Sequence, residues 1–204
     1  MSNIATFRFF LLISILIALF FPHFSVAKCP TRMGSVFPQD FFLVIAHRGS
    51  TIKFPENTIP AFKESLNTDG ANSLAVDLSL TKDRKIVLWH DWDLTSPIAM
   101  VRKEKGEEVS KFKPYGPPLV ELRVQKKVSE FDFSEFIDKH GYKDKITNVK
   151  TNFKIPTFQD LIEWAVKQDK LKLLILKLRA PIDEKYLIPV MFEEIRRTVR
   201  KLSL

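Results

Sequence analysis

Four residues whose side chains could move protons or hold a phosphate follow short apolar runs between positions 42 and 95. They are His47, Arg48, Asp77 and His90. A histidine can transfer a proton near neutral pH, and an arginine can hold two oxygens of a phosphate. A carboxylate inside an apolar run is costly unless it is paired or bound to a metal ion. We therefore interpret these residues as one candidate site.

The elements that would position this site alternate along the chain. The predicted strands are residues 41–46, 73–78, 86–90 and 172–178. The predicted helices are residues 57–66, 158–167 and 183–200. This order predicts an α/β fold with parallel strands and helical crossovers. Only the link between the second and third strands is too short for a helical crossover. Ligands in such folds bind at the carboxyl ends of the strands, where the four residues fall.

Residues 94–154 show a weaker pattern and are interpreted as an insert. Residues 102–118 within it are polar, charged and rich in proline and glycine, which predicts a surface loop. Residues 128–139 are compatible with a short helix.

The first 27 residues are typical of a secretory signal peptide. An apolar run at 9–21 lies between a single positive charge and a proline, and small residues at 25–27 suit cleavage. A membrane-spanning helix needs about 20 apolar residues, so we favour a cleaved signal over a membrane anchor. We expect an exported protein with an irregular lead-in at 28–41 and one domain at 42–204.

The charge of the chain favours anionic partners. Its formal net charge is +8, which suits phosphates or membrane surfaces, including peripheral membrane contact. No basic run is interleaved with aromatic residues as a nucleic-acid groove requires, so we expect no nucleic-acid partner. The single cysteine, Cys29, excludes an internal disulfide and a cysteine metal site.

The motifs around the four residues resemble the glycerophosphodiester phosphodiesterase family. The matching segments are IAHRG at 45–49, PENTIPAF at 55–62, DLSLTKD at 77–83, HD at 90–91 and IPT at 155–157. The family is part of the phosphatidylinositol-phosphodiesterase-like superfamily of TIM barrels, and it is also similar in fold to the sphingomyelinase D toxins. The resemblance implies a (β/α)8 barrel with an insert after the third strand. A full barrel needs about 250 residues, so we expect roughly the first four strands.

The resemblance also implies a reaction. Such enzymes are phosphoric diester hydrolases of lipid metabolism that convert glycerophosphodiesters to glycerol 3-phosphate and an alcohol. His47 and His90 would be the catalytic acid and base, and Arg48 and Lys177 would bind the substrate phosphate. Glu56 and Asp77 would bind a divalent cation, Ca²⁺ or Mg²⁺. By itself, Glu56 could equally be a helix-capping or helix-dipole residue.

Two positions depart from the family pattern at its metal site. Ala75 stands where the family has a glutamate on the second strand. On the fourth strand the missing glutamate corresponds either to Lys177 or to Ile175, depending on the register. We hypothesise that the Lys177 ammonium projects toward Asp77 and supplies the positive charge of the absent metal ion.

Two further interpretations stay open. The chain could be a catalytically impaired relative that binds a phosphate or a lipid headgroup without turnover. It could also be a truncated gene product. A half barrel leaves two open sheet edges, which predicts self-association.

Overall fold

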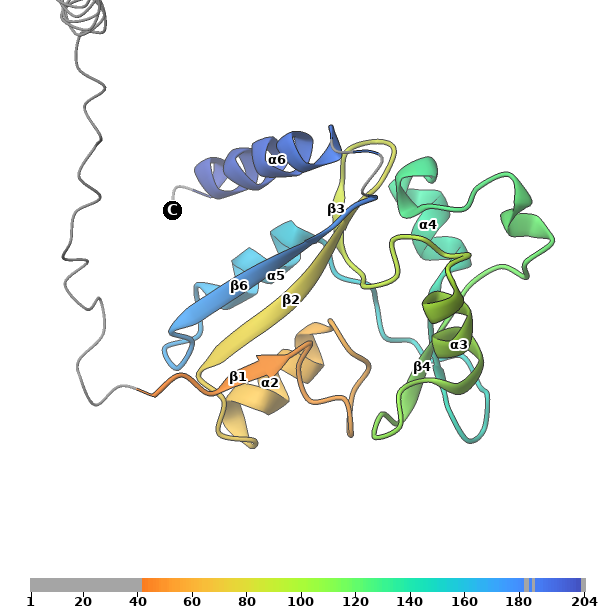
Figure 1. Cartoon of the computed structure of the whole chain (residues 1–204). Helices are drawn as coiled ribbons and strands as arrows, with labels where there is room; N and C mark the ends of the chain where they lie inside the picture. Colours follow the sequence, from red (N-terminus) through yellow and green to blue (C-terminus); the bar gives the residue numbers. More distant parts are fainter. Residues whose placement is uncertain (1–41, 182–183, 185, 203–204) are drawn as a thin grey trace, which may run out of the picture. The chain divides into compact units, whose positions relative to one another are not determined.

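The computed structural model describes residues 42–181, 184 and 186–202 (Figure 1). The predicted signal peptide and lead-in lie outside the described residues. The strands are β1 (Ile45–His47), β2 (Ser73–Leu80), β3 (Ile86–Leu88), β4 (Phe112–Tyr115), β5 (Gly141–Asp144) and β6 (Leu173–Arg179). The α-helices are α2 (Ile59–Asn67), α3 (Pro97–Lys105), α4 (Phe133–Lys139), α5 (Phe158–Ala165) and α6 (Leu187–Lys201). Two short 3-10 helices, η1 (Glu121–Arg123) and η2 (Val128–Glu130), lie in the insert.

Within the described residues the main sheet has four strands, with β2 at its centre (Figure 1). β1 and β6 both pair with β2 in parallel, whereas β3 pairs with it antiparallel. The parallel α/β arrangement is therefore confirmed, and the described residues do not close a barrel. The fourth predicted strand pairs with β2 and not with β3. The reason is that the short 81–85 turn folds β3 back against β2 as a hairpin.

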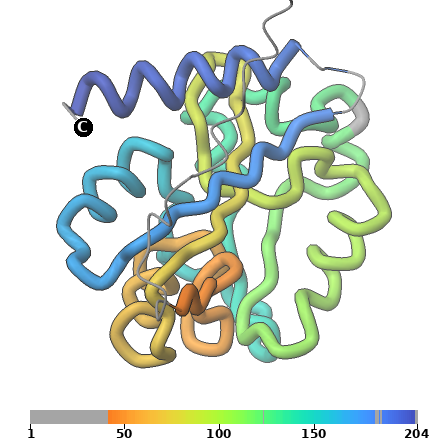
Figure 2. The backbone as a smooth tube through the Cα atoms, turned by 60° about the vertical axis from the view of Figure 1, so that its left-hand side comes forward, coloured from red at the N-terminus to blue at the C-terminus, as the bar shows by residue number. Residues whose placement is uncertain are grey.

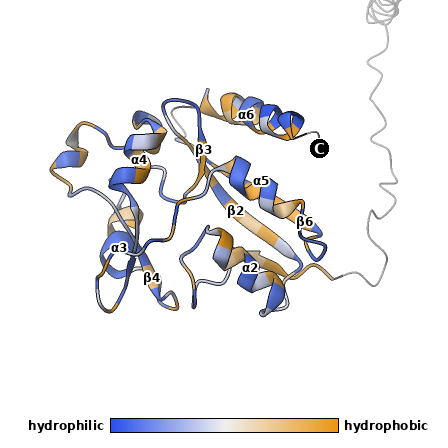
Figure 3. Ribbon diagram, turned by 180° about the vertical axis from the view of Figure 1, so that it is seen from behind, coloured by the Kyte–Doolittle hydropathy of each residue, from blue (hydrophilic) through white to orange (hydrophobic). Residues whose placement is uncertain are grey.

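One face of this sheet packs against helices to form the hydrophobic core. Alternate residues of β2, beginning with Leu74 and Val76, are buried there against α2, α5 and α6. Figure 3 shows that each of these helices carries both hydrophobic and hydrophilic residues, as amphipathic helices do. The other residues of β2 point to the opposite face because side chains alternate along a strand. That face carries the candidate site.

The insert has more regular structure than the sequence predicted. Residues 102–118 do not form a loop throughout, because they contain the end of α3 and the whole of β4. β4 and β5 form an antiparallel ribbon beside α3 and α4, seen in green beside the main sheet in Figure 2. A second core holds the insert together around the aromatic residues Trp89, Phe131, Phe136 and Tyr142. Among the helices in the described part of the chain, none is long and apolar enough to cross a membrane.

Candidate active site

A tight turn after β1 directs Arg48 toward the centre of the site. Arg48 has a φ of 62° and Gly49 a φ of 86°, and the Arg48 backbone N–H donates to the Ala75 carbonyl at 2.8 Å. A left-handed backbone is unfavourable for arginine, and such strain is often found at functional sites. The turn leaves His47 exposed at the strand end and buries the Arg48 side chain.

Glycine is required at position 49 because its backbone is left-handed and because a side chain there would clash with α2. A Cβ at this position would lie 2.7 Å from the Ala61 Cβ and 2.8 Å from the Ala61 carbonyl carbon.

We expect Gly49→Ala to lower the free energy of unfolding by about 3 kcal/mol, from about 1 kcal/mol of left-handed strain and about 2 kcal/mol of overpacking. Gly70→Ala is the control, since Gly70 also has a positive φ (75°) but nothing within 4 Å. Denaturant unfolding should give a loss of about 1 kcal/mol for this control. Equal losses in both variants would contradict the steric argument.

Asp77 lies on the site face of β2 and is fully buried. Its carboxylate contacts Arg48 Nε at 2.8 Å and Arg179 at 2.8 Å, and accepts a hydrogen bond from Asn57 Nδ2 at 3.2 Å. Burial by itself raises the pKa of Asp77, but the charges of Arg48 and Arg179 outweigh it and hold that pKa below its ordinary value. Asp77 is therefore ionised at neutral pH.

The β2–β3 hairpin brings His90 next to Asp77. The Trp89 backbone N–H donates to the Asp77 carbonyl at 3.1 Å, and the Ser79 hydroxyl donates to the Trp89 carbonyl at 2.8 Å. The sequence predicted that Asp77 and His90 each end a strand and that the link between these two strands is too short for a helical crossover. The structure places the two residues together because β3 runs antiparallel to β2 and ends beside Leu78.

Asp91 fixes the orientation of the His90 ring. His90 Nδ1 lies 2.6 Å from Asp91 Oδ1, and Arg102 Nε lies 3.0 Å from both oxygens of that carboxylate. Burial by itself raises the pKa of Asp91. The hydrogen bond with His90 and the charge of Arg102 outweigh burial, so the pKa of Asp91 lies below its ordinary value. An ionised Asp91 only accepts, so His90 Nδ1 carries the hydrogen. This leaves Nε2 as the ring nitrogen available to a substrate.

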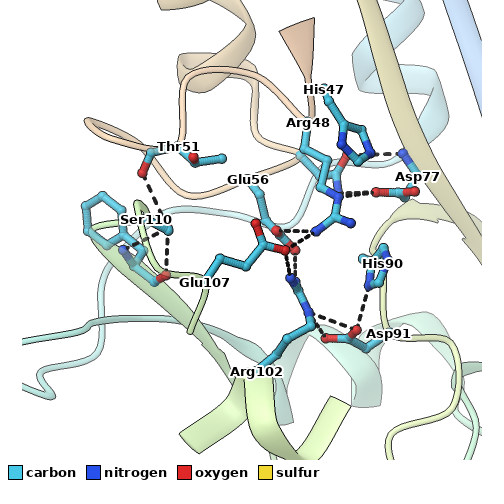
Figure 4. Close-up of polar contacts among 12 residues, drawn as sticks. His47, Arg48, Thr51, Glu56, Asp77, His90, Asp91, Arg102, Glu107 and Ser110 are labelled. Carbon is cyan, nitrogen blue, oxygen red and sulfur yellow. Dashed lines mark hydrogen bonds and ion pairs between the residues drawn. The ribbon is translucent and has the colours of Figure 1, made fainter. Parts of the chain in front are cut away.

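Arg48 and Arg102 share two carboxylates at the centre of the site (Figure 4). Arg48 lies 2.9 Å from Glu56 Oε2 and 2.7 Å from Glu107 Oε1. Arg102 pairs with the same two glutamates. Glu56, predicted as a metal ligand, is thus held between two guanidinium groups. Arg48, predicted to bind the substrate phosphate, is 8% exposed and is engaged by carboxylates of the protein itself.

Lys177 contacts His47 and not Asp77. Its ammonium lies 3.0 Å from His47 Nε2, although the backbone positions of Lys177 and Asp77 are paired across β2 and β6. The hypothesis that Lys177 projects to Asp77 is wrong, because Arg48 and Arg179 already occupy that carboxylate. An ammonium only donates, so His47 Nε2 is unprotonated. Partial burial, and then the charges of Arg48 and Lys177, lower the pKa of His47 below its ordinary value of 6.5.

Removal of the Lys177 charge is expected to shift the pH dependence of His47. A lowered pKa means that His47 becomes unprotonated at a lower pH than an ordinary histidine. Lys177→Met should raise this pKa, so the acidic limb of a kcat/KM profile should move to higher pH. Histidine NMR titration of the full chain gives the same pKa without requiring turnover. Lys172→Met is the control. Lys172 is exposed and directly precedes β6, so its replacement should leave the pKa of His47 unchanged. An unchanged His47 pKa in Lys177→Met would contradict the contact.

The residues of the site do not fit a divalent cation. Both oxygens of Glu56 and both oxygens of Asp77 pair with arginines. β2 and β6 place Ala75 beside Ile175, and neither side chain offers an oxygen. A hard divalent cation needs several oxygen ligands. Within the described ranges, no group of three or more histidine, cysteine, aspartate or glutamate side chains is arranged to hold a metal ion.

Three charged residues of this site were missed by reasoning from the sequence. Arg102 and Glu107 fall in the segment predicted as a surface loop, and Arg179 falls one position beyond the predicted end of its strand. Strand alternation could have revealed Arg179, since it follows Lys177 by two positions and shares its face. Ser96 and Pro97 are an N-cap and a first-turn proline that could have revealed α3, and with it Arg102.

The comparison with known protein families identifies the chain. The profile of the glycerophosphoryl diester phosphodiesterase family matches residues 47–195, a range that begins at His47, the last residue of β1, and contains β2, β3, α3 and β6. The chain belongs to this family. The fold, with its parallel strands and incomplete barrel, agrees with that membership. The resemblance seen in the motifs at 45–49, 55–62 and 90–91 is therefore confirmed.

Individual relatives agree with the family profile. A glycerophosphodiester phosphodiesterase of Caldanaerobacter subterraneus subsp. tengcongensis is 31% identical over 134 residues, covering 63% of this chain and 52% of the relative. The uncharacterized protein YqiK of Bacillus subtilis is 31% identical over 126 residues, covering 62% and 41%. The chain thus spans about half the length of these curated relatives. A Silicibacter pomeroyi crystal structure of a protein that carries the family name has a TM-score of 0.55 and 22% identity, covering 78% of this chain and 53% of that one. This likeness shows the shared fold.

Proposed function

We propose that this chain hydrolyses glycerophosphodiesters to glycerol 3-phosphate and an alcohol. Family membership supports the reaction class. The observation that carries the proposal is the pair of differently held histidines near Asp77. His47 has its Nε2 lone pair directed at Lys177, and His90 has its Nδ1 fixed by Asp91.

These two histidines suit opposite roles in proton transfer. His47, unprotonated at Nε2, takes the proton of the attacking hydroxyl as a new P–O bond forms. His90 donates a proton from Nε2 to the alcohol oxygen as the old P–O bond breaks. The ionised Asp91 balances the charge that the His90 ring carries when both of its nitrogens are protonated. The attacking hydroxyl is that of water, so the products are glycerol 3-phosphate and the alcohol. Loss of the proton from His47 to solvent and uptake of a proton by His90 then restore the starting state for the next turnover.

The phosphate is proposed to bind at the two cations of β6. Lys177 is partly exposed, and the Arg179 side chain is 28% exposed. An anionic substrate attracts the Lys177 ammonium, which releases His47 Nε2 to act as a base. Arg48 contributes indirectly, because it pairs with Asp77, the carboxylate that also holds Arg179. In this proposal Ala75 and Ile175 replace the family's metal carboxylates, and arginines supply the charge that a divalent cation would provide elsewhere.

The test is product formation by the full chain supplied with glycerophosphocholine. The expected result is release of glycerol 3-phosphate by the wild type and its loss in His47→Ala, while both proteins melt at similar temperatures. Activity unchanged in His47→Ala would overturn the catalytic assignment.

A binding function without turnover is the second candidate. It is favoured by Arg48, whose guanidinium is occupied by Glu56, Asp77 and Glu107. It predicts saturable binding of glycerophosphocholine in calorimetry without product. Detection of glycerol 3-phosphate would exclude it.

Export is also proposed. It is supported by the sequence of residues 1–27, with the apolar run at 9–21. N-terminal sequencing of the mature protein from its natural host should find a start near residue 28. A mature chain that still begins at Met1 would contradict cleavage.

A further inference from the structure

Three loops beside the active site form a surface with exposed aliphatic tips. We define the three-loop rim as residues 50–55, 107–111 and 145–150. Ile52, Val109 and Ile146 are 67%, 71% and 90% exposed, one from each loop, and Val149 is 62% exposed. Figures 1 and 2 both show the three loops at the lower edge of the molecule. Exposed aliphatic residues are ordinary when scattered singly, but these four gather at one edge.

The three loops are held to one another by hydrogen bonds. The Lys111 backbone N–H donates to the Thr51 carbonyl at 3.2 Å, and the Lys145 N–H donates to the Lys111 carbonyl at 2.9 Å. The Lys145 ammonium donates to the Glu107 carbonyl at 2.7 Å and to the Glu108 carbonyl at 3.1 Å. The aliphatic tips are therefore presented together by a connected scaffold.

Lysines line up next to these tips in a way that costs stability. On the β4–β5 ribbon, Lys113 is paired directly with Lys143, and Lys143 forms a bridge with Lys150. Like charges directly opposite on neighbouring strands are destabilising. The Lys143 and Lys150 ammonium groups lie over the Tyr115 ring, at 5.6 Å and 4.7 Å from its centroid. Among the described residues no carboxylate forms an ion pair with these three lysines, so the row is available to an anionic partner.

We propose that the three-loop rim and this lysine row dock on the surface of an anionic lipid bilayer. Aliphatic side chains at loop tips enter the boundary between headgroups and acyl chains, and neighbouring lysines bind anionic headgroups. The arrangement favours a bilayer over a folded protein partner because each of the four tips is at least 62% exposed, which shows that they do not pack together into a flat apolar patch. Glu107 links the rim to the active site, since its carboxylate pairs with Arg48 and Arg102. Docking therefore places the active site next to the lipid headgroups.

The test uses a fluorescent reporter at the tip of the rim. In the full chain with Cys29→Ser, Ile146→Cys is labelled with the environment-sensitive dye NBD. The control carries the label at Val166→Cys, a 54% exposed position at the end of α5. Because each dye reports on its own position, binding through the apolar N-terminal run does not mimic insertion of the rim.

Vesicles of phosphatidylcholine with about a third phosphatidylglycerol should shift the emission at position 146 to the blue and leave position 166 unchanged. Phosphatidylcholine alone should give a much weaker response. One lysine near an anionic surface contributes about fivefold in affinity. Replacing Lys113, Lys143 and Lys150 with glutamine should therefore raise the lipid concentration needed for a half-maximal blue shift about 100-fold. The matched control replaces Lys167, Lys170 and Lys172, which are exposed between α5 and β6, and should change it little.

Three outcomes would overturn the proposal. They are an unchanged spectrum at position 146 with anionic vesicles, equal weakening by both lysine triples, and a blue shift with polyglutamate but not with vesicles. The last outcome would assign the rim to an acidic protein partner. None of these measurements depends on phosphodiesterase activity, so failure of the proposed function leaves the docking result interpretable.

Discussion

Replacing His90 with asparagine is expected to lower kcat for glycerophosphocholine about a thousandfold, in the range of a lost general acid or base. The His90 ring is held by Asp91 at 2.6 Å and makes no other hydrogen bond among the described residues. Asparagine keeps a polar side chain of similar reach but cannot transfer a proton. The His90 side chain is 16% exposed and lies outside the hydrophobic cores, so the melting temperature should change little.

Asp91→Asn is the informative companion variant. It removes the charge that fixes the tautomer of His90, and it leaves the buried Arg102 with one carboxylate fewer. We expect a smaller loss of kcat than in His90→Asn together with a measurable loss of stability, because Asp91 orients the acid without touching the substrate. A His90→Asn enzyme that retains a rate within about tenfold of wild type would contradict the proton-transfer role.

Replacing Arg48 with methionine is expected to lower the free energy of unfolding by about 3 to 5 kcal/mol, as found when one partner of a buried ion pair is removed. Arg48 contacts Glu56 at 2.9 Å and Asp77 at 2.8 Å, and both carboxylates are buried. Methionine keeps the apolar part of the side chain but removes one of the two arginines that pair with each carboxylate, leaving Arg102 on Glu56 and Arg179 on Asp77. Chemical denaturation at neutral pH measures the loss.

Arg84→Met is the matched control for this prediction. Arg84 pairs with Glu194 at 3.0 Å, but its side chain is 55% exposed, and exposed pairs contribute about 0–1 kcal/mol.

The loss of unfolding free energy in Arg48→Met should also become smaller in acid. Asp77 has a lowered pKa in the wild type, so the stability it contributes is present above its unfolded pKa and is lost as the pH falls. Equal losses in the two variants would show that Arg48 is not the centre of the cluster.

The fold could largely be predicted from the sequence because its strands are continuous apolar runs with capped helices between them. The helix that begins at Ile59 is capped by Thr58 and ends at Asn67, close to the predicted range of 57–66. The insert was harder to predict. The helix α3 buries only Ala99 and Arg102, so its sequence lacks the apolar periodicity by which a helix is recognised.

The candidate site could be predicted in part of its members and not in its pairings, because Arg102, Glu107 and Arg179 were missed. Proximity of His47, Asp77 and His90 follows from polar residues at strand ends. The partner of Lys177 does not, since it depends on a competition for Asp77 that two guanidinium groups win. Arginine binds a carboxylate in a planar, two-point geometry that an ammonium cannot match, and the competing Arg179 lay outside the predicted strand.

The site is proposed to work with arginines in place of a divalent cation. The most direct test is the release of glycerol 3-phosphate from glycerophosphocholine by the full chain after exhaustive treatment with a chelator. The site pairs Glu56 and Asp77 with arginines where a divalent cation would otherwise need their oxygens. The expected result is turnover that persists in the chelator and disappears in His47→Ala. Turnover that is lost in the chelator and restored by Ca²⁺ or Mg²⁺ would contradict the assignment of that charge to the arginines.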